Sequence, residues 1–153
     1  MCGAGAEGLD DSACTGCPAG KFKGTAGPGT CLECTDPHAL PNLGSPTVVA
    51  NTVCQCKPGS IGPDNGTCTL CDAGKYVDVQ GAAVCVLCPA GTFSTKVGAN
   101  TSTLCASCPA ASSSPAGSDN QDDCTCNVGT TGPNGGACIA CDAGKYKAKT
   151  GKL

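Results

Sequence analysis

Cysteine is the residue that most constrains how this chain can fold. There are 17 cysteines among 153 residues, a density above the roughly 8–10% that is typical of short disulfide scaffolds. The chain has two Tyr, two Phe and no Trp, so large apolar side chains cannot supply the stability that a chain of this length usually takes from its core. The composition therefore predicts a fold that is held together by covalent cross-links or by metal.

Charge and hydropathy exclude several classes of partner. No apolar run approaches the roughly 18 residues that a membrane span needs, so we expect no membrane span in this segment. The net charge is −3 and all nine basic residues are lysines. Without arginine, nucleic acid is not an expected partner. A cysteine density of this kind persists as disulfides in an oxidising compartment, which predicts an extracellular or cell-surface location.

The sequence repeats itself. Residues 54–76 align without a gap with residues 124–146, at an offset of 70, and the segment that starts at Cys2 aligns with the one that starts at Cys56. These alignments predict a partial repeat unit over 1–54, a complete unit over 55–124 and the start of a further unit over 125–153. In a tandem repeat each unit contacts only its neighbours. We therefore expect a small disulfide-rich fold of β-hairpins and loops that forms an elongated tandem-repeat rod without a conventional core.

Sixteen of the cysteines divide into consecutive loops, each of which would contribute about 3 kcal/mol by restricting the unfolded chain. The loops run from Cys2 to Cys14, Cys17 to Cys31, Cys34 to Cys54, Cys56 to Cys68, Cys71 to Cys85, Cys88 to Cys105, Cys108 to Cys124 and Cys126 to Cys138. Cys141 opens a ninth loop that copies the one from Cys71. Its partner would fall near position 155, past Leu153, so we expect Cys141 to be unpaired here because a longer array has been cut.

Local sequence predicts short hairpins joined by tight turns. Residues 62–66 and 132–136 are turn sequences rich in Gly, Pro and Asn, and the stretches around 75–77 and 83–86 contain strand-forming residues. The Ser- and Pro-rich segment 110–118 is expected to be extended, exposed and a possible carrier of O-linked sugar.

The aromatic residues share one position, five residues after the cysteine that opens a loop. We expect each ring to lie over the adjacent disulfide and glycine turn; the alternative is a row of ligand contacts. The four residues are Phe22, Tyr76, Phe93 and Tyr146.

The motif C-P-A-G-K/T-F/Y, followed some ten residues later by C-x-x-C, resembles the ephrin-receptor-like repeats, which are related in pattern to TNF-receptor modules. The segments 56–68 and 126–138 look like the closing half of an EGF-like module. In combination these motifs are similar to tandem arrays in large extracellular proteins of algae and other protists. The resemblance implies an elongated stalk with a mechanical or adhesive role. A crossed pairing, Cys17 with Cys34 and Cys31 with Cys54, would resemble a complete EGF module and stays open.

Other chemical interpretations are weaker. The spacing C-x2-C-x13-C-x2-C, which starts at Cys14 and again at Cys68, is close to a zinc-ribbon arrangement, but the C-x-C pairs and the unbroken repeat argue against metal or any other cofactor. His38 has no second histidine or nucleophile nearby in the sequence, so we predict that the chain is not an enzyme.

Two charge patterns remain. The pairs 10–11 and 122–123 are acidic but lack calcium-loop spacing. Lys21, Lys75 and Lys145 recur in register and could form a lysine stripe for an acidic glycan.

These observations lead to one functional hypothesis and one alternative. The first is a non-enzymatic structural or adhesive segment of a long extracellular protein, which forms a surface filament, flagellar hair or coat by contact with copies of itself or with other extracellular proteins. The alternative is the ligand-binding ectodomain of a cell-surface receptor. Two sequons, which begin at Asn65 and Asn100, predict N-linked glycans.

Overall fold

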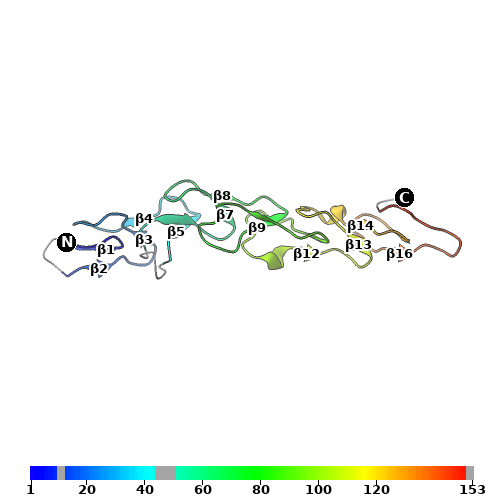
Figure 1. The fold of residues 1–153 in the computed structure, drawn as a ribbon, viewed down its shortest axis with the longest axis horizontal. Coiled ribbons are helices and arrows are strands. Elements are labelled where there is room, and N and C mark those ends of the chain that lie inside the picture. Colours follow the sequence, from blue (N-terminus) through cyan, green and yellow to red (C-terminus); the bar gives the residue numbers. More distant parts are fainter. Residues whose placement is uncertain (10–12, 44–50, 151–153) are drawn as a thin grey trace. The chain divides into compact units, whose positions relative to one another are not determined.

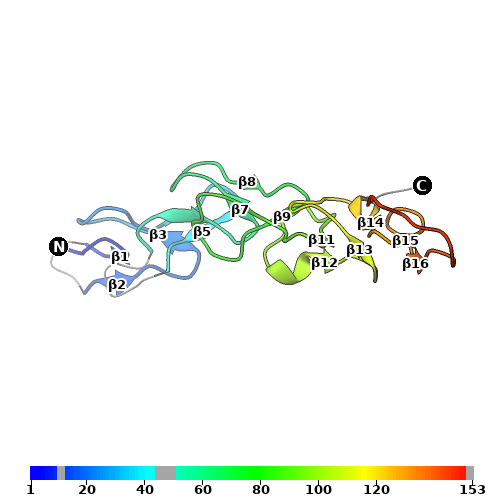
Figure 2. The ribbon, with the colours of Figure 1, turned by 45° about the vertical axis from the view of Figure 1, so that its right-hand side comes forward.

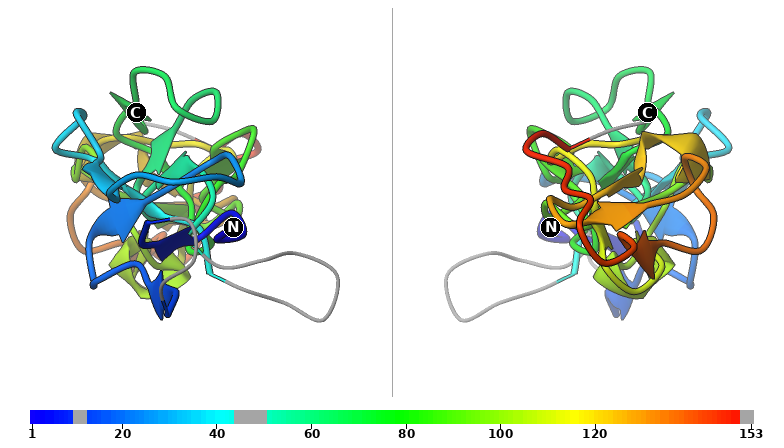
Figure 3. Two further views of the ribbon diagram at one scale, coloured as in Figure 1. Left: turned by 90° about the vertical axis from the view of Figure 1, so that its left-hand side faces the viewer. Right: turned by 90° about the vertical axis from the view of Figure 1, so that its right-hand side faces the viewer.

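The computed structural model describes residues 1–9, 13–43 and 51–150. It divides into two units, one made of residues 1–69 and 79–83 and the other of residues 70–78 and 84–153. Figures 1, 2 and 3 show that both units consist mainly of loops with very short strands, and the described residues contain no α-helix. Each unit is described by itself below.

The first unit is a series of two-stranded antiparallel sheets. Strand β1 pairs with β2, β3 with β4, and β5 with β6, while β7 forms a sheet with β8, a strand that lies at the boundary of the unit. The strands are β1 Ala6–Glu7, β2 Thr15–Gly16, β3 Lys21–Phe22, β4 Leu32–Glu33, β5 Ala39–Pro41, β6 Cys54–Cys56, β7 Ser60–Ile61 and β8 Thr69–Leu70.

The second unit repeats this plan. Strand β9 pairs with β10, β11 with β12, β13 with β14 and β15 with β16, again antiparallel, and two single-turn 3-10 helices, η1 and η2, close the longer loops. Their bounds are β9 Lys75–Tyr76, β10 Val86–Leu87, β11 Thr92–Phe93, η1 Ser102–Leu104, β12 Ala106–Ser107, β13 Ser112–Ser113, η2 Gln121–Asp123, β14 Thr125–Cys126, β15 Thr130–Thr131 and β16 Ile139–Ala140.

The recurring motif after each opening cysteine is a β-turn. In the Cys88 loop the N–H of Thr92 donates to the carbonyl of Pro89 at 3.1 Å, and Gly91 between them has a φ of 81°. A turn of this type needs a positive φ at its third residue, and glycine adopts such a φ without strain. The Cys108 loop makes the same turn with Ala111 at that position, at a φ of 60°. The motif therefore encodes the sharp turn that leads into each hairpin.

Buried cystine takes the place of a core. The one cluster of buried apolar residues in the described chain contains Ala39 and the cysteines 54, 56 and 68, with Phe22 packed against it. The largest of the fully buried side chains are six cysteines and Ser60. The prediction of a small disulfide-rich fold of hairpins and loops without a conventional core is confirmed.

Two local expectations hold only in part. The strand expected around 83–86 begins at Val86, because pairing begins after the disulfide at Cys85. The segment 110–118 is extended at β13, as expected, but it is not exposed throughout, since Ser114 and Ser118 are buried. Small serine side chains allow close packing, and the hydroxyl of Ser114 donates to the carbonyl of Thr92 at 2.9 Å. An O-linked sugar on Ser114 would have to break that hydrogen bond.

Candidate functional site: the disulfide-closed loops and an apolar pocket

The sixteen loop cysteines form eight disulfides in the structure, and every bond joins consecutive cysteines of the chain. The Cα–Cα distances, 5.4 to 5.8 Å, fall in the range of unstrained disulfides. The pairs are Cys2–Cys14, Cys17–Cys31, Cys34–Cys54, Cys56–Cys68, Cys71–Cys85, Cys88–Cys105, Cys108–Cys124 and Cys126–Cys138. The sequence leaves two disulfide pairings open, and the structure has the uncrossed one.

Cys141 is the remaining cysteine and has a free thiol that is partly buried. It lies just after β16, in the copy of the turn motif that spans Cys141 to Tyr146. Its backbone N–H donates to the carbonyl of Gly129 at 3.0 Å, as that of Cys88 donates to Gly74 at 2.9 Å. The backbone of Cys141 is thus held like that of the paired cysteines that open other loops.

A recurring backbone hydrogen bond joins several of the loops to the loop that follows. The carbonyl of the cysteine that opens one loop accepts from a left-handed glycine in the following loop, at 2.7 to 2.9 Å. The four instances are Cys2 with Gly27, Cys56 with Gly81, Cys71 with Gly98 and Cys88 with Gly117. Two of these bonds lie in the first unit and two in the second, so in each unit neighbouring loops are fixed to one another by the backbone and not by side-chain packing alone.

Contacts of Gly74 reach both the next loop, which starts at Cys88, and the loop after it, which starts at Cys108. Gly74 has a φ of 77°, and its N–H donates to the carbonyl of Ser94 at 2.7 Å. A Cβ atom at Gly74 would lie 2.2 Å from the carbonyl oxygen of Gly117. The glycine of the turn motif therefore serves two purposes here, since it makes the turn and it admits the backbone of the Cys108 loop, two loops further along the chain.

The four repeat aromatics do not share one environment. Phe22, Tyr76 and Phe93 are partly buried, and each lies in a strand of a hairpin. Tyr146 is 86% exposed, which differs from the expectation that it covers a disulfide. Tyr76 pairs with Val86, whereas residues 144–150 belong to no strand. The exposure of Tyr146 therefore follows from the lack of a paired strand in the described part of its loop.

The predicted lysine stripe is largely neutralised. Lys75 and Lys145 each lie within 3.0 Å of the aspartate three residues earlier, and Lys21 lies 3.7 Å from Glu33. These exposed pairs contribute little stability, but they cancel the positive charge that an acidic glycan would need. The idea of a recurring basic surface is therefore not supported at these positions.

Two other lysines are buried, and the sequence reasoning did not identify them. Lys23 and Lys147 are the sixth residues after their opening cysteines and are both 7% exposed. The ammonium of Lys23 donates to the carbonyls of Ala6, at 3.0 Å, and Gly27, and that of Lys147 donates to the carbonyl of Cys126 at 3.3 Å. The same position holds Val77, which is also buried. This position directly follows the aromatic residue in every copy of the motif, and that recurrence is the sequence signal that could have identified it as a buried position.

Asp36 is a polar link between two loops. Its Oδ2 accepts from the backbone N–H of Cys68 at 2.9 Å and its Oδ1 from that of His38 at 2.7 Å. These two hydrogen bonds, and then the nearby His38 ring, hold the pKa of Asp36 below its ordinary value. The nearest atoms of the carboxylate and the ring, Oδ1 and Nδ1, are 3.6 Å apart. The residue thus fastens the Cys34 loop to the end of the Cys56 loop.

We expect Asp36→Asn to lower the midpoint of thermal unfolding at neutral pH, because the amide offers one acceptor where the carboxylate offers two. Because the pKa of Asp36 is lowered in the folded state, its carboxylate stabilises the protein at pH values above the ordinary pKa of 3.8. This stabilisation is lost as the pH falls through the pKa of the folded state. The midpoint difference between wild type and variant should therefore be constant near neutral pH and shrink below pH 3.8. Asp64→Asn, in an exposed turn, is the control. A difference that is the same in acid as at pH 7 would contradict this role.

The other candidate chemical groups do not converge on a site. The described residues contain no group of three or more His, Cys, Asp or Glu side chains that could hold a metal ion. The Asp123 carboxylate accepts from the N–H groups of Asp119 and Asn120, both at 3.2 Å, and so caps η2. The pair Asp10 and Asp11 lies outside the described residues.

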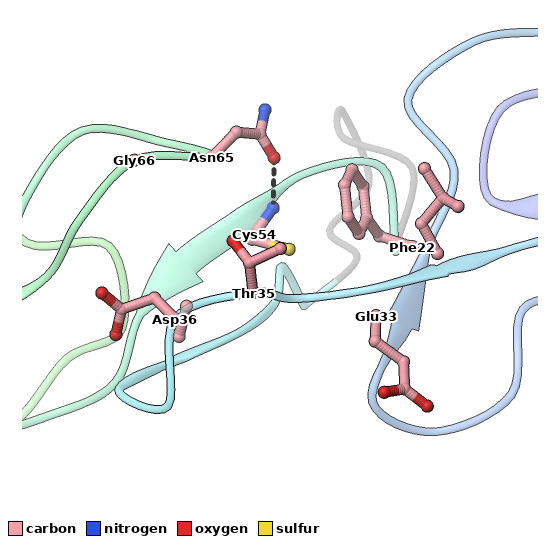
Figure 4. Close-up of a pocket in the computed structure, with 9 residues that line it drawn as sticks. Phe22, Glu33, Thr35, Asp36, Cys54, Asn65 and Gly66 are labelled. Atoms are coloured by element: carbon pink, nitrogen blue, oxygen red, sulfur yellow. Dashed lines mark hydrogen bonds between the residues drawn. The ribbon is translucent and has the colours of Figure 1, made fainter.

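The sequon asparagines are both exposed, Asn65 in the first unit and Asn100 in the second. They lie in different surroundings. Asn65 lines an apolar pocket of about 350 Å³, together with Phe22, Leu32 and Ala39. Figure 4 shows the Asn65 side chain turned toward the backbone of Cys54.

Together, the cystine-rich interior and the hairpins define a disulfide-rich module of the extracellular type. Residues 59–105 match the family model described as tyrosine-protein kinase ephrin type A/B receptor-like. The match covers the loops Cys71–Cys85 and Cys88–Cys105, so the chain contains an ephrin-receptor-like cysteine-rich repeat, and the resemblance to that family is confirmed. Comparison with the curated proteins gives no significant match. No helix among the described residues is long and apolar enough to cross a membrane.

Proposed function

We propose that this chain is a structural or adhesive segment of a longer extracellular repeat protein, whose array forms a rod in a surface filament, flagellar hair or coat. The observation that supports this most is the repeated hydrogen bond from a left-handed glycine to the opening cysteine of the preceding loop. A contact that joins one loop to the next can be repeated along an array, and a chain built from such contacts extends in one dimension.

The composition of the surface fits such a role. Many apolar side chains of the short strands and loops remain exposed, among them Leu87 and Ile139. Exposed apolar side chains that recur along an array can pack against copies of the chain or other filament proteins. The proposed partners are therefore other copies of this protein or other extracellular proteins.

A receptor ectodomain is the second candidate, and the match of residues 59–105 to an ephrin type A/B receptor-like model supports it. In that case the same loops would present a protein-binding surface next to a membrane anchor. The full coding sequence distinguishes the two, because a receptor needs a membrane span in the same chain. Electron microscopy of native material gives the complementary result, since the structural role predicts filaments.

The extended array has a direct solution test on the chain itself. A compact globular protein of 153 residues would have a radius of gyration of about 15 Å. We expect small-angle scattering of the monomeric, oxidised chain to give a value well above this, with a distance distribution skewed to long distances. A radius near that of a compact globule would contradict the rod and remove the main support for the structural role.

A further inference from the structure

In the first unit, no side chain among the described residues fills the pocket beside β6. Its apolar wall comes from Phe22, Leu32 and Ala39, and Leu32 is 62% exposed. The volume, about 350 Å³, is at the lower end of the roughly 300–1,000 Å³ of small-ligand sites. Leaving this much apolar surface in water is unfavourable. The pocket is therefore suited to a small group with one apolar face and polar edges.

The sequon Asn65-Gly66-Thr67 lies at this pocket. Both Asn65 and Gly66 line it, and Asn65 and Thr67 are exposed. The backbone N–H of Cys54 can only donate, so the Asn65 atom that it meets at 2.8 Å is Oδ1. Asn65 is held a second time by its own N–H, which donates to the carbonyl of Cys54 at 2.8 Å. The other amide atom, Nδ2, is the one that carries an N-linked sugar, and Figure 4 shows it pointing away from Cys54.

We propose that an N-linked glycan on Asn65 occupies this pocket, with its first N-acetylglucosamine against Phe22 and Leu32. In the transfer, Nδ2 forms the bond to sugar C1 and loses a proton, and the bond from C1 to the pyrophosphate of a lipid-linked oligosaccharide breaks. The apolar ring face and the N-acetyl methyl group of the sugar cover the Phe22 ring. The carboxylate of Glu33 and the hydroxyl of Thr35, which also line the pocket, can accept hydrogen bonds from sugar hydroxyls.

The second sequon provides an internal comparison. Asn100 is exposed in the Cys88 loop, and it does not line this pocket. A glycan there would project into solvent and add little to the stability of the fold. The inference therefore predicts two glycans with different behaviour on one chain.

The experiment uses the whole chain, secreted from a eukaryotic host that attaches N-glycans, with the variants Thr67→Ala, Thr67→Ser and Ser102→Ala. Thr67→Ala removes the Asn65 sequon and leaves the Asn65 side chain and its hydrogen bond to Cys54 intact, whereas Thr67→Ser keeps the sequon. Ser102→Ala removes the Asn100 sequon. Occupancy is measured by mass spectrometry after enzymatic deglycosylation, and the unfolding midpoint by thermal denaturation.

We expect Asn65 to be glycosylated, and Thr67→Ala to unfold about 2–4 °C below Thr67→Ser. The same two variants made in a host without glycosylation should unfold together, and Ser102→Ala should match wild type. In NMR spectra the N-acetyl methyl resonance of the Asn65 glycan should be shifted upfield by the Phe22 ring and should return to its usual position in Phe22→Leu.

Three results would overturn the inference. The first is an unmodified Asn65 in the secreted protein. The second is an Asn65 glycan whose methyl resonance matches that of the Asn100 glycan. The third is an equal loss of stability in Thr67→Ala and Ser102→Ala, which would mean that glycans stabilise the chain in general and not through this pocket. None of these results bears on the rod, so the inference and the proposed function can fail separately.

Discussion

Replacement of Cys88 and Cys105 by serine in one variant is expected to destabilise the protein by about 3 kcal/mol, the value for closing a loop of this size in the unfolded chain. The disulfide spans 17 residues, and Cys88 is completely buried, so the variant also loses packing. Both partners are changed so that no new thiol can exchange. Unfolding in denaturant, followed by tyrosine fluorescence or NMR, measures the loss.

Cys141→Ser is the matched control, because Cys141 is not in a disulfide. It should leave the unfolding midpoint within error of wild type. Full reduction of the wild-type protein should abolish the folded state altogether, since the described residues contain no larger apolar cluster than the one around Ala39. A reduced protein that retained its dispersed NMR spectrum would show that packing, and not cystine, holds the fold.

The second large effect is expected at Gly74. Gly74→Ala places a Cβ 2.2 Å from the carbonyl oxygen of Gly117, so the backbone of one of the two loops must move. Overpacking of this kind costs about 1–3 kcal/mol or more. The left-handed φ of 77° adds about 1–2 kcal/mol for a residue with a Cβ. Thermal unfolding of the oxidised variant measures the sum.

Gly91→Ala separates the two contributions. Gly91 occupies the same place in the turn motif with a φ of 81°, and a Cβ there would meet nothing within 4 Å. It should therefore show the backbone cost alone, about 1–2 kcal/mol, and remain clearly more stable than Gly74→Ala. Equal losses in the two variants would mean that the close approach between the Cys71 loop and the Cys108 loop does not form.

The parts of the fold that sequence could predict are those that cysteine and glycine impose locally. Repeat spacing indicated consecutive loops because a disulfide at short separation constrains the chain whatever lies inside it. The turn motif is equally local, since only the residue at the third position needs a positive φ. Hairpins follow from these two constraints.

Long-range polar contacts could not be predicted from the same pattern. Asp36 meets the N–H of Cys68, 32 residues later, and nothing in its Asp-Pro-His context indicates this. Lys23 is buried because carbonyls of Ala6 and Gly27 surround its ammonium, although lysine is normally an exposed residue. The lysine stripe failed partly for a related reason, because Glu33 meets Lys21 only across the β3–β4 hairpin. Asp72, in contrast, is a local partner three residues before Lys75.

The pocket beside Asn65 could be predicted from the sequence only in part. The sequon at Asn65 was visible in the sequence, but the apolar wall opposite it comes from Phe22 and Leu32, more than 30 residues earlier. The repeat boundaries at 54 and 124 and the rod itself stay predictions. Both depend on how many copies of the loop pattern the array contains.

The consecutive disulfide pattern is the central claim, and peptide mapping under denaturing, non-reducing conditions tests it most directly. Cleavage after Lys23 and Glu33 releases residues 24–33, whose single cysteine is Cys31. The structure predicts that this peptide stays joined to the one that carries Cys17, and that Cys141 is joined to none of the other cysteines of the chain. If residues 24–33 were joined instead to the peptide that begins at Cys34, or if the native protein contained zinc and free thiols, the uncrossed loops would be contradicted.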